Sequence, residues 1–311
     1  MRVIFMGTPD FSVGTLEALI ESKEHEVVLV VTQPDRKKGR GKKVMFSPVK
    51  DVAVKYGIPV YQPERIRNAE CLEELKKYAA DVCVVVAFGQ ILPESLLTMT
   101  PYGAINVHAS LLPAYRGAAP IQWAILDGQE KTGVTTMQMD AGLDTGDMLL
   151  KAETPIGEAE TGGSLHDRLA RMGADLLLET LKGLEEKRLH PVPQGEMTTH
   201  YAHMLEKDMG KIDFTRSATE IDRQIRGLSP WPSAYTFFEG KLLKIWEARV
   251  VPGSGRPGEV IARDKESFTV AAGKDALKVT FLQLTGKKAM DTGAFLRGNA
   301  VEKGLLLGEE A

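Results

Sequence analysis

The most constraining feature of this sequence is a series of short apolar segments in its first half that polar residues hardly interrupt. Residues 3–6, 26–32 and 82–87 are apolar at consecutive positions, not at alternate ones, with polar residues only at the two ends of the second range, and many are β-branched. A strand with one face in water alternates apolar and polar side chains, so continuous apolar strands indicate burial on both faces, as in a parallel sheet. The pattern therefore predicts a sheet that helices cover on both sides.

Amphipathic segments separate these strands and give the order of a doubly wound fold. Helices are expected at residues 11–20, 47–56, 71–79, 118–126 and 164–187. Further strands are expected at residues 60–61, 104–108 and 134–139. Strands that alternate with helices through right-handed crossovers predict an α/β domain. We therefore expect a Rossmann-like, doubly wound, mostly parallel sheet over residues 1–188.

The pattern changes after residue 188. Residues 189–207 have no periodicity, and we expect a linker there. Short strands with frequent turns follow, at residues 234–238, 242–247, 258–262, 268–271 and 277–284. Short strands at this spacing predict an OB-like β-barrel domain over residues 208–311. Trp231, between two prolines, is expected to be a core or interdomain anchor.

Composition and cysteine content place the chain among ordinary globular proteins. Hydrophobic residues make up 43% of its 311 residues and charged residues 26%. The longest apolar run, from Val82 to Phe88, is far shorter than the ~20 residues of a membrane-spanning helix, so no membrane partner is expected. Cys71 and Cys83 are expected to be packing residues in a reducing compartment, and the N-terminus has no features of a secretion signal. We therefore expect a cytoplasmic protein, with a monomer as the default state.

The fingerprints of nucleotide binding are missing. The turn from Gly7 to Gly14 does not match G-x-G-x-x-G, and Pro9 removes a backbone N–H where a dinucleotide needs donors. Residues 41–43 lack the upstream glycine and the hydroxyl residue of a P-loop. A nicotinamide cofactor is therefore not expected.

The segment 33–46 is strongly basic and too long for a routine turn between a strand and a helix. Its cations are Arg36, Lys37, Lys38, Arg40, Lys42 and Lys43. The segment leaves the carboxyl end of a strand, which is where open α/β sheets bind ligands. A solvated charge run is the alternative, but this position favours a flexible arm that binds phosphates and becomes ordered on binding.

Polar residues gather at the end of the strand 104–108. Asn106 and His108 are two positions apart, so their side chains project from one face of the sheet. An Asn that caps a loop and a His that packs in the core are the alternatives. Because a Leu-Leu-Pro loop and Arg116 follow immediately, we favour a binding or catalytic site.

A second polar segment, residues 139–147, contains three acids and two glycines and follows the strand 134–139. We expect it too at a carboxyl edge of the sheet. It lacks the spacing of a calcium loop, and a turn with solvated acids is the alternative. A carboxylate facing His108 would form an imidazole pair that serves as a proton shuttle.

Together these motifs resemble the folate-dependent formyltransferases. The resemblance rests on Asn106-x-His108, on Ser-Leu-Leu-Pro-x-Tyr-Arg-Gly at residues 110–117 and on the loop that contains Asp144. It continues nearly end to end, through residues 7–11, 32–35, 62–64, 87–93, 201–202 and 230–232. It implies that Asn106, His108 and Asp144 are the catalytic residues.

The same resemblance implies the substrates. The formyl group of 10-formyltetrahydrofolate would be transferred to the amino group of methionyl initiator tRNA, without a metal. The implied folate-binding residues are Phe88, Gly89, Gln90, Ile91, Leu92, Ser110, Leu111, Leu112 and Pro113. The implied tRNA-binding residues are the six cations of the basic segment together with Lys207, and Arg40 or a close neighbour is implied to enter the acceptor stem.

Three other functions stay open at this stage. A formyltransferase acting on a small amine, such as glycinamide ribonucleotide or an amino-sugar nucleotide, would keep the three polar residues but leave the basic segment and the barrel without a purpose. A hydrolase would release formate from the same folate. A non-catalytic RNA-binding protein would not need the Asn106, His108 and Asp144 set.

Overall fold

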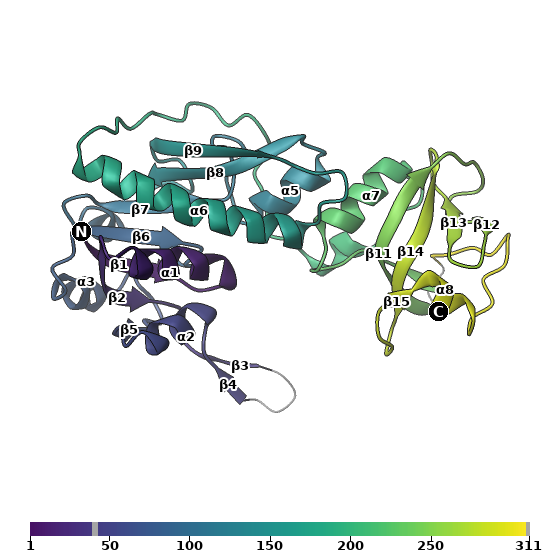
Figure 1. Cartoon of the computed structure of the whole chain (residues 1–311), viewed down its shortest axis with the longest axis horizontal. Coiled ribbons are helices and arrows are strands. Elements are labelled where there is room, and N and C mark those ends of the chain that lie inside the picture. Colours follow the sequence, from purple (N-terminus) through teal and green to yellow (C-terminus); the bar gives the residue numbers. More distant parts are fainter. Residues whose placement is uncertain (39–42, 309–311) are drawn as a thin grey trace. The chain divides into compact units, whose positions relative to one another are not determined.

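The computed structural model of the chain describes residues 1–38 and 43–308 (Figure 1). Contacts divide the chain into two compact units. Unit 1 consists of Met1–Pro120, Lys131–Pro155 and His166–Ala202. Unit 2 consists of Ile121–Glu130, Ile156–Leu165 and His203–Ala311. Residues 189–202, where the sequence places the start of a linker, thus belong to unit 1.

One seven-stranded sheet forms the centre of unit 1, in the order β5-β2-β1-β6-β7-β8-β9. Its strands are β1 (Arg2–Gly7), β2 (Glu26–Val31), β5 (Val60–Tyr61), β6 (Val82–Val86), β7 (Ala104–His108), β8 (Lys131–Gln138) and β9 (Met148–Pro155). The strands from β5 to β7 pair parallel with their neighbours. The pairs β7–β8 and β8–β9 are antiparallel. The predicted Rossmann-like, mostly parallel fold is confirmed.

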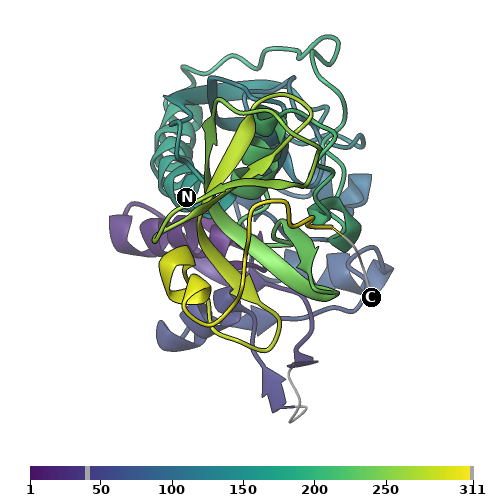
Figure 2. The same cartoon turned by 90° about the vertical axis from the view of Figure 1, so that its right-hand side faces the viewer.

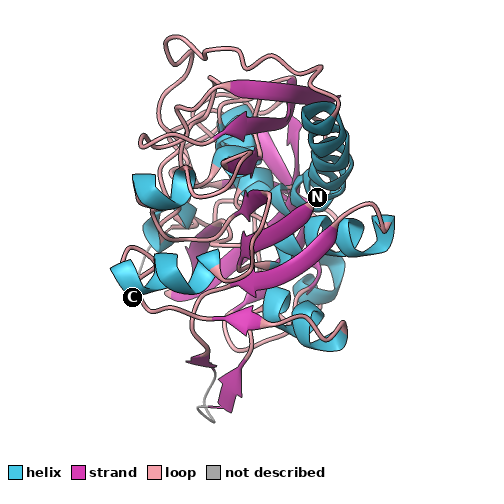
Figure 3. Cartoon of the chain, turned by 90° about the vertical axis from the view of Figure 1, so that its left-hand side faces the viewer, coloured by secondary structure: helices cyan, strands magenta, loops and turns pink. Residues whose placement is uncertain are grey.

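Helices cover both faces of this sheet, as Figure 3 shows. They are α1 (Val13–Ser22), α2 (Pro48–Lys55), α3 (Ala69–Lys76), α4 (Glu94–Leu97) and most of α6 (Gly162–Glu185). Ile4 and Met6 pack with Leu75 of α3 in one core cluster. Val3 and Phe5, which alternate with them along β1, are fully buried as well. Burial on both faces explains why β1 is apolar at consecutive positions.

The described part of the basic segment contains two short strands that the sequence analysis does not predict. Its backbone forms β3 (Arg36–Lys38) and β4 (Lys43–Met45), which pair antiparallel with Arg36 opposite Met45. The pairing uses backbone groups, so it does not require the apolar side chains from which strands are predicted. Residues 39–42 lie outside the described residues.

Unit 2 contains the antiparallel sheet that Figure 2 shows, in the order β10-β11-β14-β13-β12, with β15 beside β14. The strands are β10 (Tyr235–Phe238), β11 (Lys241–Val251), β12 (Val260–Arg263), β13 (Phe268–Ala271), β14 (Ala276–Leu284) and β15 (Met290–Asp291). Its helices are α7 (Ala218–Gly227), α8 (Thr292–Leu296) and α5 (Pro120–Leu126), whose first residue belongs to unit 1. The sheet agrees with the predicted OB-like domain.

Two features of unit 2 differ from the sequence prediction. Helix α7 is not among the expected helices, although Ser217 and Glu220 form a reciprocal capping box at its start, a pattern that the sequence carries. Trp231 is not a core residue, because it is 53% exposed.

Candidate functional site

The candidate site of unit 1 lies at the end of β7. Asn106 and His108 occupy alternate positions of this strand, and both are buried, with 9% and 7% exposed. Within the described part of the chain, the side-chain amide of Asn106 makes no hydrogen bond. Its oxygen and nitrogen are not among the side-chain atoms that are both fully buried and unpaired, so they keep some exposure. A nearly buried amide that the protein does not use itself is available to a ligand.

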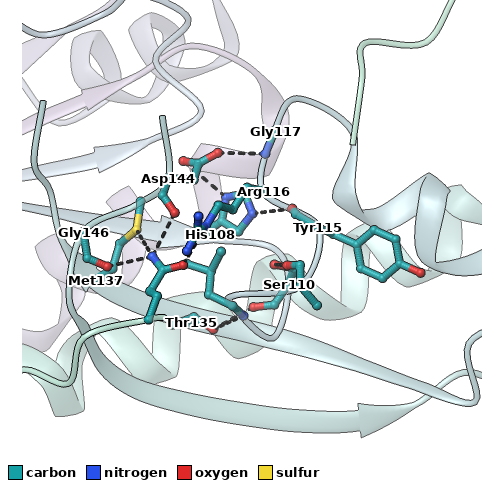
Figure 4. Close-up of polar contacts among 12 residues, drawn as sticks. His108, Ser110, Tyr115, Arg116, Gly117, Thr135, Met137, Asp144 and Gly146 are labelled. Atoms are coloured by element: carbon teal, nitrogen blue, oxygen red, sulfur yellow. Dashed lines mark hydrogen bonds and ion pairs between the residues drawn. The ribbon is translucent and has the colours of Figure 1, made fainter. Parts of the chain in front are cut away.

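The ring of His108 is fixed by what its two nitrogens face (Figure 4). Nε2 lies 3.0 Å from the carbonyl oxygen of Tyr115. A carbonyl only accepts hydrogen bonds, so Nε2 carries the hydrogen and donates it. Nδ1 faces Oδ1 of Asp144 at 3.7 Å. The nitrogen that has a free lone pair in the neutral ring therefore points at a carboxylate.

Asp144 reaches this position through an unusual backbone conformation. Its φ is +55°, in the left-handed region, which Asp tolerates better than most residues. Its Oδ2 accepts a hydrogen bond of 2.9 Å from the backbone N–H of Gly117, which leaves Oδ1 toward His108. Gly117 itself has φ +124°, and a Cβ there would lie 2.5 Å from the carbonyl oxygen of Ala202. The carboxylate is thus held by a backbone turn that needs glycine.

The sequence analysis predicts this carboxylate–imidazole contact, but it places the start of the acidic loop at the wrong edge of the sheet. The acidic loop is expected at the carboxyl edge that carries His108, but β8 runs antiparallel to β7, so Gln138 at its end lies opposite Ile105. Met139 donates its backbone N–H to the carbonyl of Ala104, at the start of β7. The loop 139–147 therefore begins near the opposite edge and must return along the sheet to bring Asp144 to His108.

The loop after β7 is held in shape by its own polar groups. The Ser110 hydroxyl is fully buried and donates to the carbonyl of Ala114 at 2.6 Å. Thr135 on β8 donates to the carbonyl of Ser110 and accepts from the N–H of Leu112. The Leu112 side chain is also fully buried, whereas Leu111 and Pro113 are partly exposed. Ser110 and Leu112 thus shape this loop, and its exposed atoms come mainly from Leu111 and Pro113.

The segment after β6 also contains both buried residues that shape it and exposed residues that a ligand can reach. Phe88 and Leu92 are buried and pack in the core with β1. The side chain of Gln90 is bonded at both ends, to the N–H of Ile66 and the carbonyl of Pro63. Ile91 is 72% exposed, and Gly89 is exposed with φ +85°. Of the predicted folate-binding residues here, Ile91 and the backbone at Gly89 are therefore the accessible ones.

A partly buried polar network holds the base of the basic segment, where β3 and β4 leave unit 1. Lys50 on α2 lies 2.5 Å from Oδ2 of Asp35, just before β3, and 2.8 Å from Oε1 of Gln62. Gln62 donates to Oδ1 of Asp35 and to the carbonyl of Gln33. The Lys50 ammonium also lies 3.9 Å from the ring centre of Phe46, just after β4. The two strands of the hairpin therefore leave unit 1 from a fixed base.

The predicted tRNA-binding cations are described only in part. Arg36 is exposed on β3. Lys207 is exposed at the start of a short 3-10 turn in unit 2. The strands β3 and β4 include the backbone of Lys37, Lys38 and Lys43, whose side chains lie outside the described residues, as do Arg40 and Lys42 entirely.

Residues that the sequence analysis does not assign to the site join it from the segment 189–202. Thr199 accepts the backbone N–H of Tyr115 at 2.7 Å, and Ala202 donates its N–H to the carbonyl of Arg116. Gln194 contacts both Arg116 and the acidic loop. The segment has no periodicity, so nothing in its pattern distinguishes it from a linker.

The site contains no group of three or more His, Cys, Asp or Glu side chains placed to hold a metal ion, and none occurs elsewhere among residues 1–38 and 43–308. The helices of the same described ranges all lack the length or the apolarity to cross a membrane.

Comparison with known protein families identifies both parts of the chain. Residues 1–181 match the family model described as formyl transferase, and residues 204–300 match its C-terminal domain. The chain belongs to the formyl transferase family. The family resemblance read from the motifs around Asn106, His108 and Asp144 is confirmed.

Individual relatives cover the whole chain. A methionyl-tRNA formyltransferase of Lachnospira eligens is 56% identical over 99% of this chain and 100% of its own length. One of Citrifermentans bemidjiense is 52% identical over 100% of this chain and 97% of its own. Members of the formyl transferase family thus align with both units at high identity.

Solved structures with low identity share the fold. HypX from Aquifex aeolicus, in complex with tetrahydrofolic acid, has a TM-score of 0.64 at 19% identity and covers 96% of this chain and 47% of its own. An N-formyltransferase from Helicobacter canadensis, in complex with folinic acid and dTDP-3-aminofucose, has a TM-score of 0.65 at 17% identity over 90% of this chain and 98% of its own.

The contacts of Asp35, at the base of the basic hairpin formed by β3 and β4, predict how stability depends on pH. Hydrogen bonds from Lys50, followed by Gln62, hold the pKa of the Asp35 carboxyl below its ordinary value of 3.8. A lowered pKa stabilises the folded state fully above pH 3.8, and this contribution is lost as the pH falls through the lowered value. Replacing Asp35→Asn should cost about 1 kcal/mol of unfolding free energy at pH 7, and the difference should shrink on acidification.

Urea unfolding followed by circular dichroism, at pH 7 and at two values below 4, measures this difference. Glu64→Gln is the control, since Glu64 is an exposed acid on the following loop. A difference that stays constant or grows as the pH falls would contradict the sign of the shift.

Proposed function

We propose that the chain transfers the formyl group of 10-formyltetrahydrofolate to the amino group of methionyl initiator tRNA, giving N-formylmethionyl-tRNA. One observation carries the chemical part. The ring of His108 is bound at Nε2 and open at Nδ1 toward the Asp144 carboxylate, beside an Asn106 amide that no described residue uses. The acceptor follows from relatives at 49–56% identity over the full chain, which are named methionyl-tRNA formyltransferases.

The folate supplies a formyl group on a nitrogen that acts as the leaving group. As the amine lone pair adds to the formyl carbon, negative charge develops on the formyl oxygen. The Asn106 N–H is a suitable donor to that oxygen, and the positive charge of a protonated His108 stabilises it without a further hydrogen bond. The low exposure of both residues strengthens these interactions. The amine must be neutral, and free α-amino groups titrate near ~7.7–8.0, so a neutral fraction exists at pH 7.

Asp144 and His108 move the proton. The attacking nitrogen loses a proton while the leaving nitrogen gains one, so a carrier between them balances the reaction. Nδ1 of the neutral His108 ring can accept a proton, and the Asp144 carboxylate lies 3.7 Å from this nitrogen. Nε2 stays bonded to the Tyr115 carbonyl, which keeps the ring oriented during this exchange.

Segments 88–92 and 110–113 are proposed to bind the folate. The side chains of Phe88 and Leu92 anchor the first segment in the core, so its contribution is the exposed Ile91 and the backbone at Gly89. An apolar side chain beside accessible main-chain groups suits a flat ring with an amide-like edge. In the second segment Leu111 and Pro113 are partly exposed, on a loop that Ser110 braces.

The basic hairpin and unit 2 are proposed to bind the tRNA. Arg36, Lys37, Lys38, Arg40, Lys42, Lys43 and Lys207 are the proposed phosphate contacts. We further propose that residues 1–188 carry the chemistry, that residues 208–311 bind tRNA, and that the enzyme is a cytoplasmic monomer. Cys71 and Cys83, both buried free thiols, fit a reducing compartment.

A small amine is the second candidate acceptor. It is favoured by the fold shared with an N-formyltransferase solved with a nucleotide sugar. That candidate gives the basic hairpin no role, and the identity to that N-formyltransferase is only 17%.

The chemical proposal predicts that Asn106→Ala and His108→Ala each lower kcat for formyl transfer to methionyl-tRNA by about 10²–10³-fold, with KM for the tRNA nearly unchanged. Removing a group that acts on developing charge affects the transition state more than binding. Formation of formylmethionyl-tRNA, measured with purified protein and both substrates, tests this. Wild-type rates for His108→Ala would revive a non-catalytic binding role.

The proposal for tRNA recognition predicts the opposite result, a change in KM for the tRNA without a change in kcat. Replacing Arg36, Arg40 and Lys42 together by Ala should raise KM for the tRNA at least about tenfold while kcat and KM for the folate stay the same. The salt dependence of kcat/KM should also flatten, by about 0.9 in the logarithmic slope for each phosphate that is no longer neutralised. An unchanged KM and slope would reject the hairpin as the tRNA-binding element, while formylation of a small amine at equal kcat/KM would reject tRNA as the acceptor.

A further inference from the structure

Gln194 is the only buried residue between Glu185 and Tyr201, a described stretch that otherwise lies on or near the surface. A glutamine is rarely buried unless its amide is hydrogen-bonded. Residues 190–193 and 195–196, on either side of Gln194, are exposed, and Val192 is 53% exposed. The burial of Gln194 therefore directs attention to the groups that its amide holds.

The amide of Gln194 binds three oxygen or nitrogen groups of the candidate site, and its Nε2 also lies 3.8 Å from the sulfur of Met137. Its Nε2 donates to the carbonyl of Asp144 at 2.8 Å and to that of Gly146 at 2.7 Å. Its Oε1 accepts from Nε of Arg116 at 2.9 Å. Turning the amide around would set its oxygen against two carbonyls and its N–H groups against a guanidinium, so the network itself fixes the orientation.

Arg116 adds a second contact between the loop after β7 and the segment that contains Gln194. Its Nη2 donates to the carbonyl of Gly195, so the guanidinium binds both the side chain of Gln194 and the next residue of the backbone. In Figure 4, Arg116, Gly117 and Asp144 lie together around the ring of His108. Arg116 immediately precedes Gly117, whose N–H binds the Asp144 carboxylate. The backbone and the side chain of Asp144 are therefore held from neighbouring positions.

Asp144 requires such a restraint. Residues 140–143 before it are exposed, and its left-handed φ is a conformation that a free loop leaves readily. The Gly117 N–H holds Oδ2 only while the Asp144 backbone stays in place. Losing the two N–H groups of Gln194 would leave two carbonyls without these donors and allow the turn to relax.

We propose that Gln194 is a positioning residue of the formyl transfer reaction, which acts by holding the Asp144 backbone so that the carboxylate faces Nδ1 of His108. This rests on the proposed function, in which Asp144 and His108 carry the proton. The proposal gives the segment 189–202 a part in catalysis.

Gln194→Glu tests this in the full-length chain. The substitution keeps the shape and an acceptor for Arg116 but removes both N–H donors to the loop. Because a displacement of a catalytic group by about 1 Å costs up to about 10²-fold, we expect kcat, measured well below the thermal midpoints of both proteins, to fall by about 10–100-fold, with both KM values close to wild type. Val192→Ala, in the same segment but exposed, is the control and should retain full activity.

A double-mutant cycle with Asp144→Asn separates positioning from a general structural role. In the Asp144→Asn background the Gln194→Glu change should cost less than about twofold, since the carboxylate that it positions is gone. An equal loss in both backgrounds would overturn the proposal, as would wild-type kcat for Gln194→Glu or a loss explained by a lowered thermal midpoint. Wild-type activity of Asp144→Asn alone would instead refute the role of Asp144 in the proposed function.

Discussion

The contact between the Asp144 carboxylate and Nδ1 of His108 is the interaction on which the candidate site depends. The strand order alone does not bring the two residues together. The two residues belong to antiparallel neighbours, so the loop after β8 starts beside Ala104, at the far end of β7 from His108. A carboxylate brought back along the sheet needs fixed backbone contacts. The N–H of Gly117 and the amide of Gln194 supply them.

The rest of unit 1 provides rigid surroundings for this contact. The strand β7 is buried along its whole length, which fixes Asn106 and His108 on one face. Thr135 ties the loop after β7 to β8, and Tyr115 in the same loop binds Nε2 of His108. Proton transfer and charge stabilisation need groups held within about 0.5 Å of the productive geometry, which strands and braced loops provide better than free loops.

The sequence predicts the parts of this fold that depend on local pattern. Continuous apolar runs such as Val82–Val86 predict buried parallel strands, and Asn106-x-His108 at a strand end predicts a site. What depends on pairing between distant segments is not predictable: the antiparallel direction of β8, the return of its loop and the bonds of Gln194. The strands β3 and β4 escape prediction because backbone pairing requires no apolar pattern, and exposure of Trp231 depends on turns that local sequence does not determine.

The most direct test of this arrangement is the tautomer of His108, measured by nitrogen NMR of the imidazole rings and assigned among the six histidines by comparison with His108→Ala. In the neutral ring the hydrogen should be on Nε2, bound to the Tyr115 carbonyl, with Nδ1 unprotonated toward Asp144. Asp144→Asn should change the Nδ1 signal and leave the Nε2 signal nearly unchanged. A hydrogen on Nδ1 of the neutral ring would contradict the geometry from which the transfer of the proton is derived.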